Sequence, residues 1–437
     1  MERLFKLSQR GTDVKTEVIA GLTTFMTMAY VLAVQPAAIC GGDAAVVDVN
    51  SVVISKSAIM ISCALVSGLI TMLMAFYTNL PFALSTGMGS NFILGAMIQS
   101  QAISFGSAML ITLVSGIIFV ALTVFGLRDL IVRVIPKNLK IAISASIGFF
   151  IAYLGFKNSG IGSFANGIAL GDITAPAVLL SIGGLLLMIV LNALNVKGAI
   201  LISILAITLI GIPCGVTHIS GVAAVPDFSD LSNVMLNFDL SNVFTASGLI
   251  LVFVCFFGDF FSTLGTVLAV AGRANMLDEN GNLPGIERPF LVDAIGTCVG
   301  ALTGNTTVTT YVESTSGVEA GGRSGLTSLV TGVMFLLTVF LAPLFVAIPY
   351  CATGPALIYV GFLMLKGFVD IDFSSFDECI APCVMLMFTA FTGSITNGLG
   401  AGIIVHVLVK LVKGRAKDVH PIMYVLCALM VLYFIVG

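Results

Sequence analysis

Apolar runs that are long enough to cross a lipid bilayer recur along the whole chain. Of its 437 residues, 58% are hydrophobic and 9% are charged, whereas soluble proteins have about 25% charged residues. Because a transmembrane helix needs about 20 apolar residues, the pattern predicts an all-α protein that crosses the membrane many times. The predicted segments are 16–38, 57–77, 80–99, 105–126, 139–156, 174–194, 197–213, 247–271, 289–302, 306–320, 326–348, 353–369, 379–396, 398–413 and 421–436. We expect the first fourteen to span, and the last to span or to lie along the membrane surface.

Basic residues gather between alternate spans. They lie before the first span and after the fourth, eighth and fourteenth: Arg3, Lys6, Arg10, Lys15, Arg128, Arg133, Lys137, Lys140, Arg273, Arg288, Lys410, Lys413, Arg415 and Lys417. The long loop 214–247 contains no lysine or arginine. Since cytoplasmic loops carry the excess of basic residues, we expect a cytoplasmic N-terminus in the cell (inner or plasma) membrane.

The two halves of the chain resemble each other faintly. The similar pairs of segments are 147–160 with 360–372, 175–194 with 381–399, and 80–98 with 303–325. A repeat of seven spans inserts upside down, as in the inverted repeats of secondary transporters. The predicted division is a first repeat over 1–214, an extracellular connecting loop over 215–246, a second repeat over 247–413, and a tail over 414–437 that carries an apolar segment.

The stretch 303–325, TGNTTVTTYVESTSGVEAGGRSG, interrupts the apolar pattern with glycines and hydroxyls. It carries Glu313, and a carboxylate at membrane depth costs about 2.5–3.5 kcal/mol on insertion scales. Irregular polar backbone at this depth is tolerated where it is buried in protein or lines a cavity. Short, glycine-interrupted segments indicate the binding site of a transporter. The alternative is that Glu313 pairs with a basic residue inside the bundle or lies in a loop.

Two further polar residues lie in apolar surroundings. Asp259 follows eight almost purely apolar residues, and its short side chain cannot reach the membrane surface. It is therefore either protonated at neutral pH or bound to something, and reversible protonation would couple transport to a proton gradient. Asn91 lies in the sequence STGMGSNFI. For both residues the alternative is a structural hydrogen bond to a neighbouring helix.

The residues around these groups predict two broken spans. Gly87 and Gly89 let the backbone extend and then turn into a helix, which leaves N–H groups free to donate. Threonines at 306, 307, 309 and 310 predict a short strand that leads into a half-helix near Glu313. Two half-helices with facing N-termini would form a polar pocket at the bilayer midplane. Carboxylates, an amide and backbone donors suit a neutral, flat molecule better than a bare ion.

Several segments then resemble one known family. They are GLTTFMTMAYVLAVQP, PFALSTGMGSN, PKNLKIAISASIGFFIAYLGFKNSGI, NMLDENGNLPGIERPFLVDAIGT and TTVTTYVESTSGVEAGGRSGLTSLVTG. The chain resembles, over nearly its whole length, the purine permeases of the azaguanine-resistance type in nucleobase:cation symporter family 2. The resemblance implies a seven-plus-seven inverted repeat with core and gate domains, and short strands in spans 3 and 10. It also implies proton-coupled import of adenine or guanine and hypoxanthine.

The resemblance implies site residues as well. Glu313 would bind the base with Asp259 close by, both would take part in proton coupling, and Asn91 would be the third essential polar residue. Within the motif TTYVES, Thr310 and Tyr311 are predicted to contact the base. We expect Ser262, Thr27 and Thr86 to modulate the pocket.

This chain departs from the family pattern at three positions. Ser262 stands where family members commonly have a second acid, three residues after the first. Thr86 and Phe92 replace the proline and the small residue that are usual around the glycine turn. Proton coupling, base preference and the pocket wall are therefore the properties in which the chain could differ.

Other functions remain open at this point. The same fold could carry xanthine, a pyrimidine such as uracil, or a small anion, and it could be driven by sodium. An anion would require a cation in the pocket, and none stands beside the three polar residues. A membrane enzyme would require a catalytic constellation, but the three histidines, His218, His406 and His420, are scattered. We therefore predict no enzyme, no catalytic residues and no cofactor.

The remaining composition excludes further classes. The nine cysteines occur singly, and the two nearest, Cys379 and Cys383, have no histidine cluster beside them. They are interpreted as small buried residues and not as a disulfide or metal framework. No basic run predicts nucleic-acid binding. The predicted partners are a nucleobase, protons and the lipid bilayer, and the residues leave open whether the protein is a monomer or a homodimer.

Overall fold

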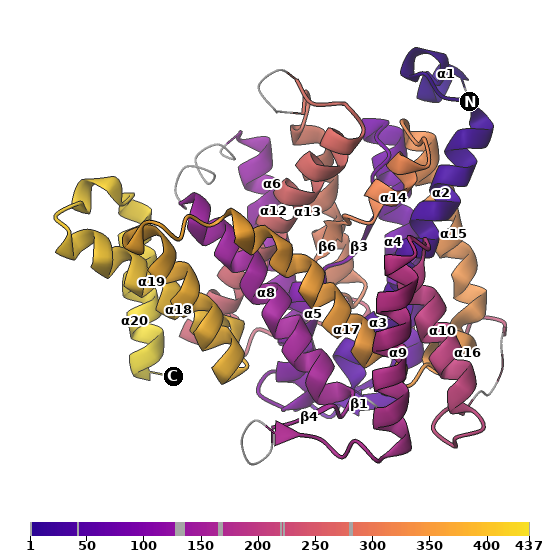
Figure 1. Ribbon diagram of the computed structural model, residues 1–437, viewed down its shortest axis with the longest axis horizontal. Helices are drawn as coiled ribbons and strands as arrows, with labels where there is room; N and C mark the ends of the chain where they lie inside the picture. The colour runs from indigo at the N-terminus through magenta and orange to yellow at the C-terminus, as the bar shows by residue number, and fades with distance from the viewer. Residues whose placement is uncertain are drawn as a thin grey trace.

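A computed structural model describes residues 2–41, 43–126, 136–164, 169–218, 221, 223–278 and 283–436. The chain is mostly helical (Figure 1). The helices are α1 (Glu2–Phe5), α2 (Val14–Met28), α3 (Val31–Cys40), α4 (Lys56–Thr78), α5 (Met88–Gln99), α6 (Phe105–Val124), α8 (Lys137–Asn158), α9 (Pro176–Ala193), α10 (Ala199–Gly211), α11 (Leu231–Val234), α12 (Ala246–Arg273), α13 (Glu287–Leu302), α14 (Ser314–Glu319), α15 (Gly325–Leu337), α16 (Ala342–Val346), α17 (Tyr350–Met364), α18 (Phe376–Thr392), α19 (Ile395–Val412) and α20 (Pro421–Val436). The strands are β1 (Ala45–Val47), β2 (Val53–Ser55), β3 (Leu84–Thr86), β4 (Gly162–Ser163), β5 (Ala169–Leu170) and β6 (Val308–Thr310).

Every apolar segment predicted from the sequence contains a helix, or a strand followed by a helix. Seven helical stretches of the described residues are long and apolar enough to cross a membrane, and four shorter apolar helices accompany them. The first span consists of α2 and α3, which meet at Ala29 and Tyr30. Spans 3 and 10 are the two broken spans, β3 with α5 and β6 with α14.

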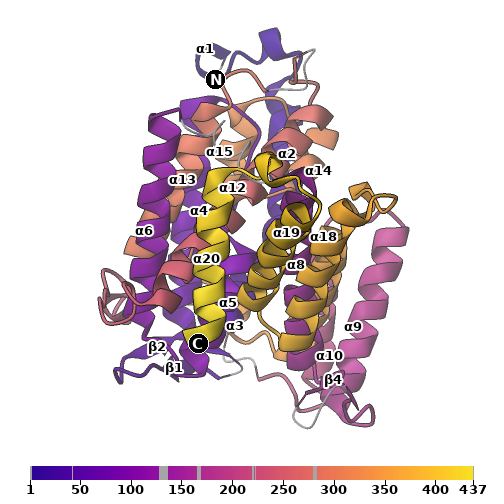
Figure 2. The same cartoon turned by 90° about the vertical axis from the view of Figure 1, so that its left-hand side faces the viewer.

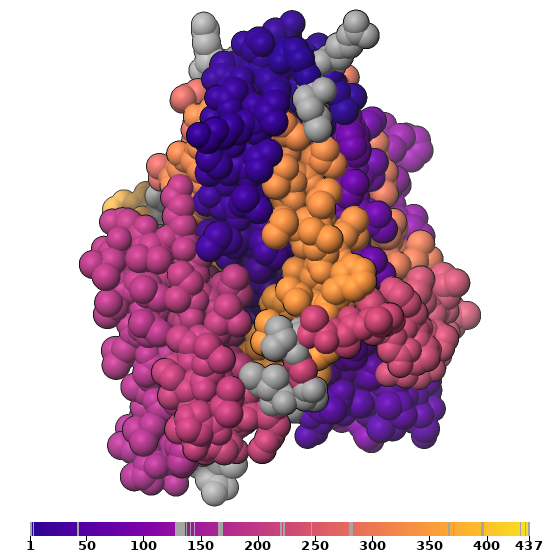
Figure 3. Space-filling view, turned by 90° about the vertical axis from the view of Figure 1, so that its right-hand side faces the viewer, coloured from indigo at the N-terminus to yellow at the C-terminus, as the bar shows by residue number. Residues whose placement is uncertain are grey.

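Helix packing shows the twofold relation between the halves. α4 packs on α15, and the equivalent pair seven spans away, α13 and α6, also packs. α9 packs on α17, as α18 does on α8, and α9 packs on α10, as α18 does on α19. The segments that resemble each other in sequence, in α8 and α17 and in α9 and α18, occupy equivalent places in this pattern. Figure 3 shows one face, with α2 and α15 side by side and α9 and α10 next to them.

The two broken spans meet at their strands. β3 and β6 pair antiparallel, with Leu84 opposite Thr310 and Thr86 opposite Val308. All six strand residues are buried. Gly87 N donates to Thr307 O at 2.6 Å and so extends the ladder to the start of α5. A Cβ at Gly87 would lie 2.6 Å from Thr307 Oγ1, so only glycine fits this crossing. The predicted strands in spans 3 and 10 are therefore confirmed.

Basic segments that are distant in sequence lie at one end of the molecule. Arg10 Nη1 donates to Arg323 O at 2.7 Å, just after α14. Arg273, at the end of α12, lies 3.5 Å from the Glu319 carboxylate at the end of α14. This clustering agrees with the charge pattern of the sequence, although Arg128 and Arg133 lie outside the described residues.

Three sequence interpretations need a correction or a closer definition. The segment 421–436 forms α20, which packs along α19 with Met423, Leu426 and Met430 buried; Figure 2 shows it running toward the end opposite the N-terminus. His406, one of the three scattered histidines, is buried in α19. The prediction that the cysteines are buried is wrong for Cys214, which is exposed, and holds only in part for Cys298, Cys379, Cys383 and Cys427, which are partly buried.

Candidate functional site

A cavity of about 530 Å³ lies between the starts of the two half-helices and the helices α8, α12 and α17. The polar lining residues, here called the polar wall, come from β6, the start of α14, α12, the first turn of α5 and Tyr30. The residues that α8 and α17 contribute to the lining are all apolar. The lining residues are Tyr30, Gly87, Met88, Gly89, Ser90, Ile93, Ile143, Ile147, Val254, Cys255, Gly258, Asp259, Phe261, Ser262, Gly265, Thr266, Ala269, Thr307, Thr309, Thr310, Tyr311, Val312, Glu313, Val360, Leu363 and Met364.

Glu313 stands at the start of α14 and lines this cavity. Tyr30 Oη donates to Glu313 Oε1 at 2.8 Å, and no side chain in the described part of the chain bonds to Oε2. Glu313 therefore pairs with a tyrosine and not with a basic residue. Since an ionised carboxylate only accepts hydrogen bonds, it presents an acceptor oxygen to the cavity.

Asp259 lies on α12 and lines the same cavity as Glu313, and only 5% of it is exposed. Thr297 Oγ1, on the neighbouring helix α13, donates to Asp259 Oδ2 at 2.7 Å. The structural hydrogen bond named as the alternative therefore exists, but it uses one oxygen only. Asp259 Oδ1 is buried and has no hydrogen-bond partner among the described residues. A buried carboxylate oxygen without a partner costs free energy, so this oxygen is suited to a proton or a ligand.

Asp293 on α13 is a third buried carboxylate, which the sequence interpretation missed. Its Oδ2 accepts from Thr263 Oγ1 at 2.8 Å, and its Oδ1 accepts from the backbone N of Thr310 at 2.7 Å. Thr310 Oγ1 adds a bond of 2.9 Å. The signal was the same as for Asp259, an acid within an apolar run. Unlike Asp259, Asp293 has both oxygens bonded, and its contacts hold β6 against α12 and α13.

Of the remaining predicted site residues, some line the cavity and others lie behind its lining. Thr310 and Tyr311 line the cavity, and Tyr311 Oη donates to Thr86 O, so it also ties the two broken spans together. Ser262 lines the cavity on α12, one turn beyond Asp259. Thr86 is buried in β3 behind the lining, and Thr27 Oγ1 lies 3.5 Å from Glu313 O.

Asn91 is not among the residues that line the cavity. It lies in the first turn of α5, fully buried, and both its Oδ1 and its Nδ2 lack a hydrogen-bond partner within the described ranges. The lining groups contributed by the start of α5 are instead Gly87, Met88, Gly89 and Ser90. The first backbone N–H groups of a helix have no partner within the helix and can donate to a ligand.

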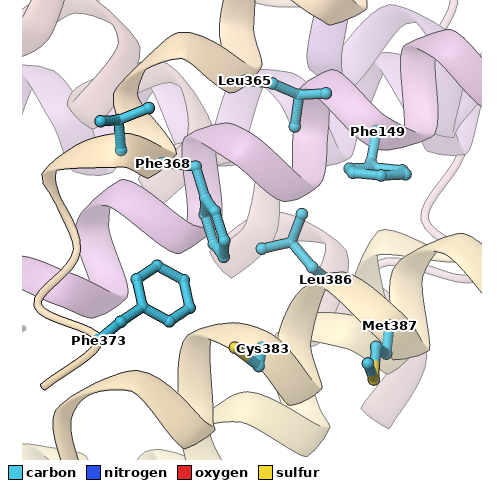
Figure 4. Close-up of a pocket in the computed structure, with 8 residues that line it drawn as sticks. Phe149, Leu365, Phe368, Phe373, Cys383, Leu386 and Met387 are labelled. Atoms are coloured by element: carbon cyan, nitrogen blue, oxygen red, sulfur yellow. The ribbon is translucent and has the colours of Figure 1, made fainter. Parts of the chain in front are cut away.

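A second hollow is chemically different. It has a volume of about 490 Å³ and lies between α8, the turn at Leu365–Asp370 and α18. Its lining is entirely apolar in the described residues: Phe149, Leu365, Phe368, Val369, Phe373, Cys383, Leu386 and Met387 (Figure 4). Without charged or strongly polar groups it cannot orient a polar solute, so the cavity beside Glu313 is the candidate site.

Comparisons with known proteins agree with this architecture. Residues 15–400 match the model of the Permease family. The adenine permease AdeQ of Escherichia coli is 35% identical, with 100% of this chain and 96% of the relative covered. The guanine/hypoxanthine permease PbuG of Bacillus subtilis is also 35% identical, with 100% and 99% covered.

Solved structures show the fold. The transmembrane domain of the cyanobacterial bicarbonate transporter BicA has a TM-score of 0.62 at 14% identity, and the match covers 89% of this chain and 97% of that chain. The murine anion transporter Slc26a9 in its inward-facing state has a TM-score of 0.64 at 12% identity, with 91% and 68% covered. At these identities only the seven-plus-seven inverted-repeat fold is shared, whereas the full-length relatives are permeases. This chain is a multi-pass membrane transporter, not an enzyme, and it belongs to the Permease family.

Proposed function

We propose that this protein imports a purine nucleobase, adenine or guanine and hypoxanthine, together with a proton. One observation carries the proposal. Glu313 and Asp259 each have a carboxylate oxygen to which no side chain of the described residues bonds, and both line one cavity between the starts of two half-helices. A purine has ring and exocyclic N–H groups that need acceptors, and ring nitrogens that accept from backbone N–H groups. The names of the relatives AdeQ and PbuG support the same class of cargo.

The shape and charge of the cavity favour a flat neutral solute. A planar base would lie between the polar wall and the apolar side chains Ile147, Val360 and Met364. None of the described lining residues is lysine, arginine or histidine, so nothing there would balance an anion. The structural likeness to bicarbonate and anion transporters therefore extends to the fold and not to the cargo.

We assign proton transfer to Asp259 and base binding to Glu313, with Thr310 and Tyr311 shaping the polar wall. Asn91 acts from behind the wall, and Ser262, Thr27 and Thr86 modulate the pocket. The cavity reaches Thr266 and Ala269, within two turns of Arg273 at the basic end of the molecule. With the N-terminus in the cytoplasm of a cell (inner or plasma) membrane, this geometry corresponds to a site open to the inside.

The proposed division is a repeat over 1–214, an extracellular connection over 215–246, a repeat over 247–413 and a tail over 414–437. Two groups of helices would move relative to each other. α8, α9, α10, α17, α18 and α19 would form the gate, and the remaining spans would form the core that carries the site. A homodimer stays a prediction.

The direct test is uptake of labelled adenine and hypoxanthine in cells that lack their own carriers, with unlabelled bases as competitors. We expect purines to compete, and a protonophore to reduce accumulation to equilibration. If uracil or xanthine competes best, the cargo is another base carried by the same fold. If uptake resists the protonophore but requires sodium, the coupling ion is sodium.

A further inference from the structure

The structure places Tyr30 beside the acid that is proposed to bind the base. Tyr30 lies at the junction of α2 and α3, and only 1% of it is exposed. Its ring lines the cavity, and its hydroxyl donates to Glu313 Oε1 at 2.8 Å. The two residues are 283 positions apart in sequence. Nothing in the sequence around Tyr30, an apolar run, distinguishes it from a packing residue.

This hydrogen bond makes the two oxygens of Glu313 different. Oε1 already accepts a hydrogen bond from the Tyr30 hydroxyl, whereas no side chain that the structure describes bonds to Oε2. A carboxylate with both oxygens available could accept hydrogen bonds from two parallel N–H groups, as it does from arginine. With Tyr30 in place, the cavity instead offers one carboxylate oxygen and, beside it, a phenolic hydroxyl. The hydroxyl can donate or accept, but it carries no charge.

The purine bases differ in the hydrogen-bond donors and acceptors that their edges present. Guanine presents two parallel donors on one edge, the ring N1–H and the 2-amino group. Hypoxanthine lacks the 2-amino group and presents N1–H beside a carbonyl, and adenine presents its 6-amino group beside a ring nitrogen. A base edge with one donor needs only Oε2 and leaves the hydrogen bond between Tyr30 and Oε1 in place. A two-donor edge would gain more from a carboxylate with both oxygens free.

We propose that Tyr30 is a specificity-determining residue that makes the site prefer a purine edge with one donor, as in adenine or hypoxanthine, over the two-donor edge of guanine. This inference rests on the proposed function. Tyr30 acts through Glu313: its hydroxyl takes one of the two acceptor sites of Oε1, so that Oε2 is the stronger acceptor for the cargo.

The test is Tyr30→Phe, which removes the hydroxyl and keeps the ring. Inhibition constants of guanine and adenine are measured against labelled hypoxanthine uptake, and their ratio is compared between variants. A hydrogen bond to a charged group is stronger than a neutral one by roughly 1 kcal/mol, so guanine should gain about fivefold relative to adenine. Tyr77→Phe, on an exposed tyrosine of α4, is the matched control and should leave the ratio unchanged.

The ratio separates a specific role from a structural one, because poorer folding lowers uptake of all bases together. A guanine-to-adenine ratio that stays within about twofold of the parent overturns the inference. Complete loss of binding by purified, folded Tyr30→Phe also overturns it, because Glu313 would then depend on Tyr30 for binding itself. If the parent protein takes up no purine, the proposed function fails instead, and the two failures are thus distinguishable.

Discussion

The two broken spans have the same backbone design but different chemistry. Each consists of a three-residue strand followed by a short helix, and the strands pair with each other. At the first, β3–α5, the cavity meets Gly87, Met88, Gly89, Ser90 and Ile93, none of which is charged. At the second, β6–α14, it meets the side chains Thr307, Thr309, Thr310 and Glu313. The inverted repeat thus supplies a symmetric scaffold, and of these two broken spans only the second contributes a charged side chain to the cavity lining among the described residues.

The largest expected effect comes from the second broken span. Glu313→Gln should reduce purine uptake by roughly 10- to 100-fold, because a hydrogen bond to a charged group contributes about 1.5–3 kcal/mol. Uptake and membrane abundance are measured together. The matched control is Glu319→Gln on the same helix, where the acid forms an exposed ion pair with Arg273. Uptake by Glu313→Gln that stays within about twofold of the parent would remove this residue from the site.

In the first broken span the expected effect is a loss of stability at the crossing of the two strands. Gly87→Ala places a Cβ 2.6 Å from Thr307 Oγ1, and such overpacking costs about 1–3 kcal/mol. Thermal unfolding of the purified protein should show a lower midpoint, and uptake should fall with it. Gly183→Ala on α9, where no atom lies within 4 Å of the added Cβ, is the control. Equal stability of the two variants would show that the strand crossing tolerates a side chain.

Asn91→Ala tests the polar group that the first half does contribute. Since the amide is buried behind the cavity and cannot titrate, we expect a several-fold weaker apparent affinity with an unchanged pH profile. Concentration series of uptake at several pH values check this. Normal affinity combined with an altered pH profile would contradict the division of roles between Asn91 and Asp259.

The smallest effect is expected at Ser262. Ser262→Asp adds a second acid one turn from Asp259 on α12, at a position that lines the cavity. Uptake should persist while its pH optimum moves, because the two carboxylates influence each other's protonation. Thr266→Ser, a change without charge on the same helix, should leave the optimum in place. An unmoved optimum in Ser262→Asp would mean that this position does not interact with the coupling acid.

The pattern of apolar and polar residues predicts much of the fold. The fifteen apolar segments follow from the runs of hydrophobic residues. The two short strands, and the placement of Asp259 and Glu313 on one cavity, follow from polar residues that interrupt those runs. A carboxylate within hydrocarbon is costly, so it stands out in the sequence. Gly87 can also be recognised in the sequence, because it belongs to a short polar stretch with two glycines inside an apolar run.

Contacts between distant segments were not predictable in this way. Tyr30 looks like any aromatic residue of an apolar span until the fold brings it to Glu313. Asp293 was overlooked although it too is an acid within an apolar run, and its threonine partners, 30 and 17 residues away in sequence, show its role only in the fold. Asn91 stands out in sequence as Glu313 does, yet its direction relative to the cavity depends on the rotation of α5, which a sequence pattern does not fix.

The most direct test of proton-coupled purine transport is the accumulation of a labelled purine by the purified protein in lipid vesicles. A membrane potential of about 100 mV, inside negative, supplies about 2.3 kcal/mol per proton. At about 1.4 kcal/mol per tenfold, one proton per neutral base gives roughly 40-fold accumulation without sodium. We predict this accumulation, its loss with a protonophore, and its loss in Asp259→Asn. Accumulation that appears only with a sodium gradient, and survives the protonophore, would contradict the proton mechanism.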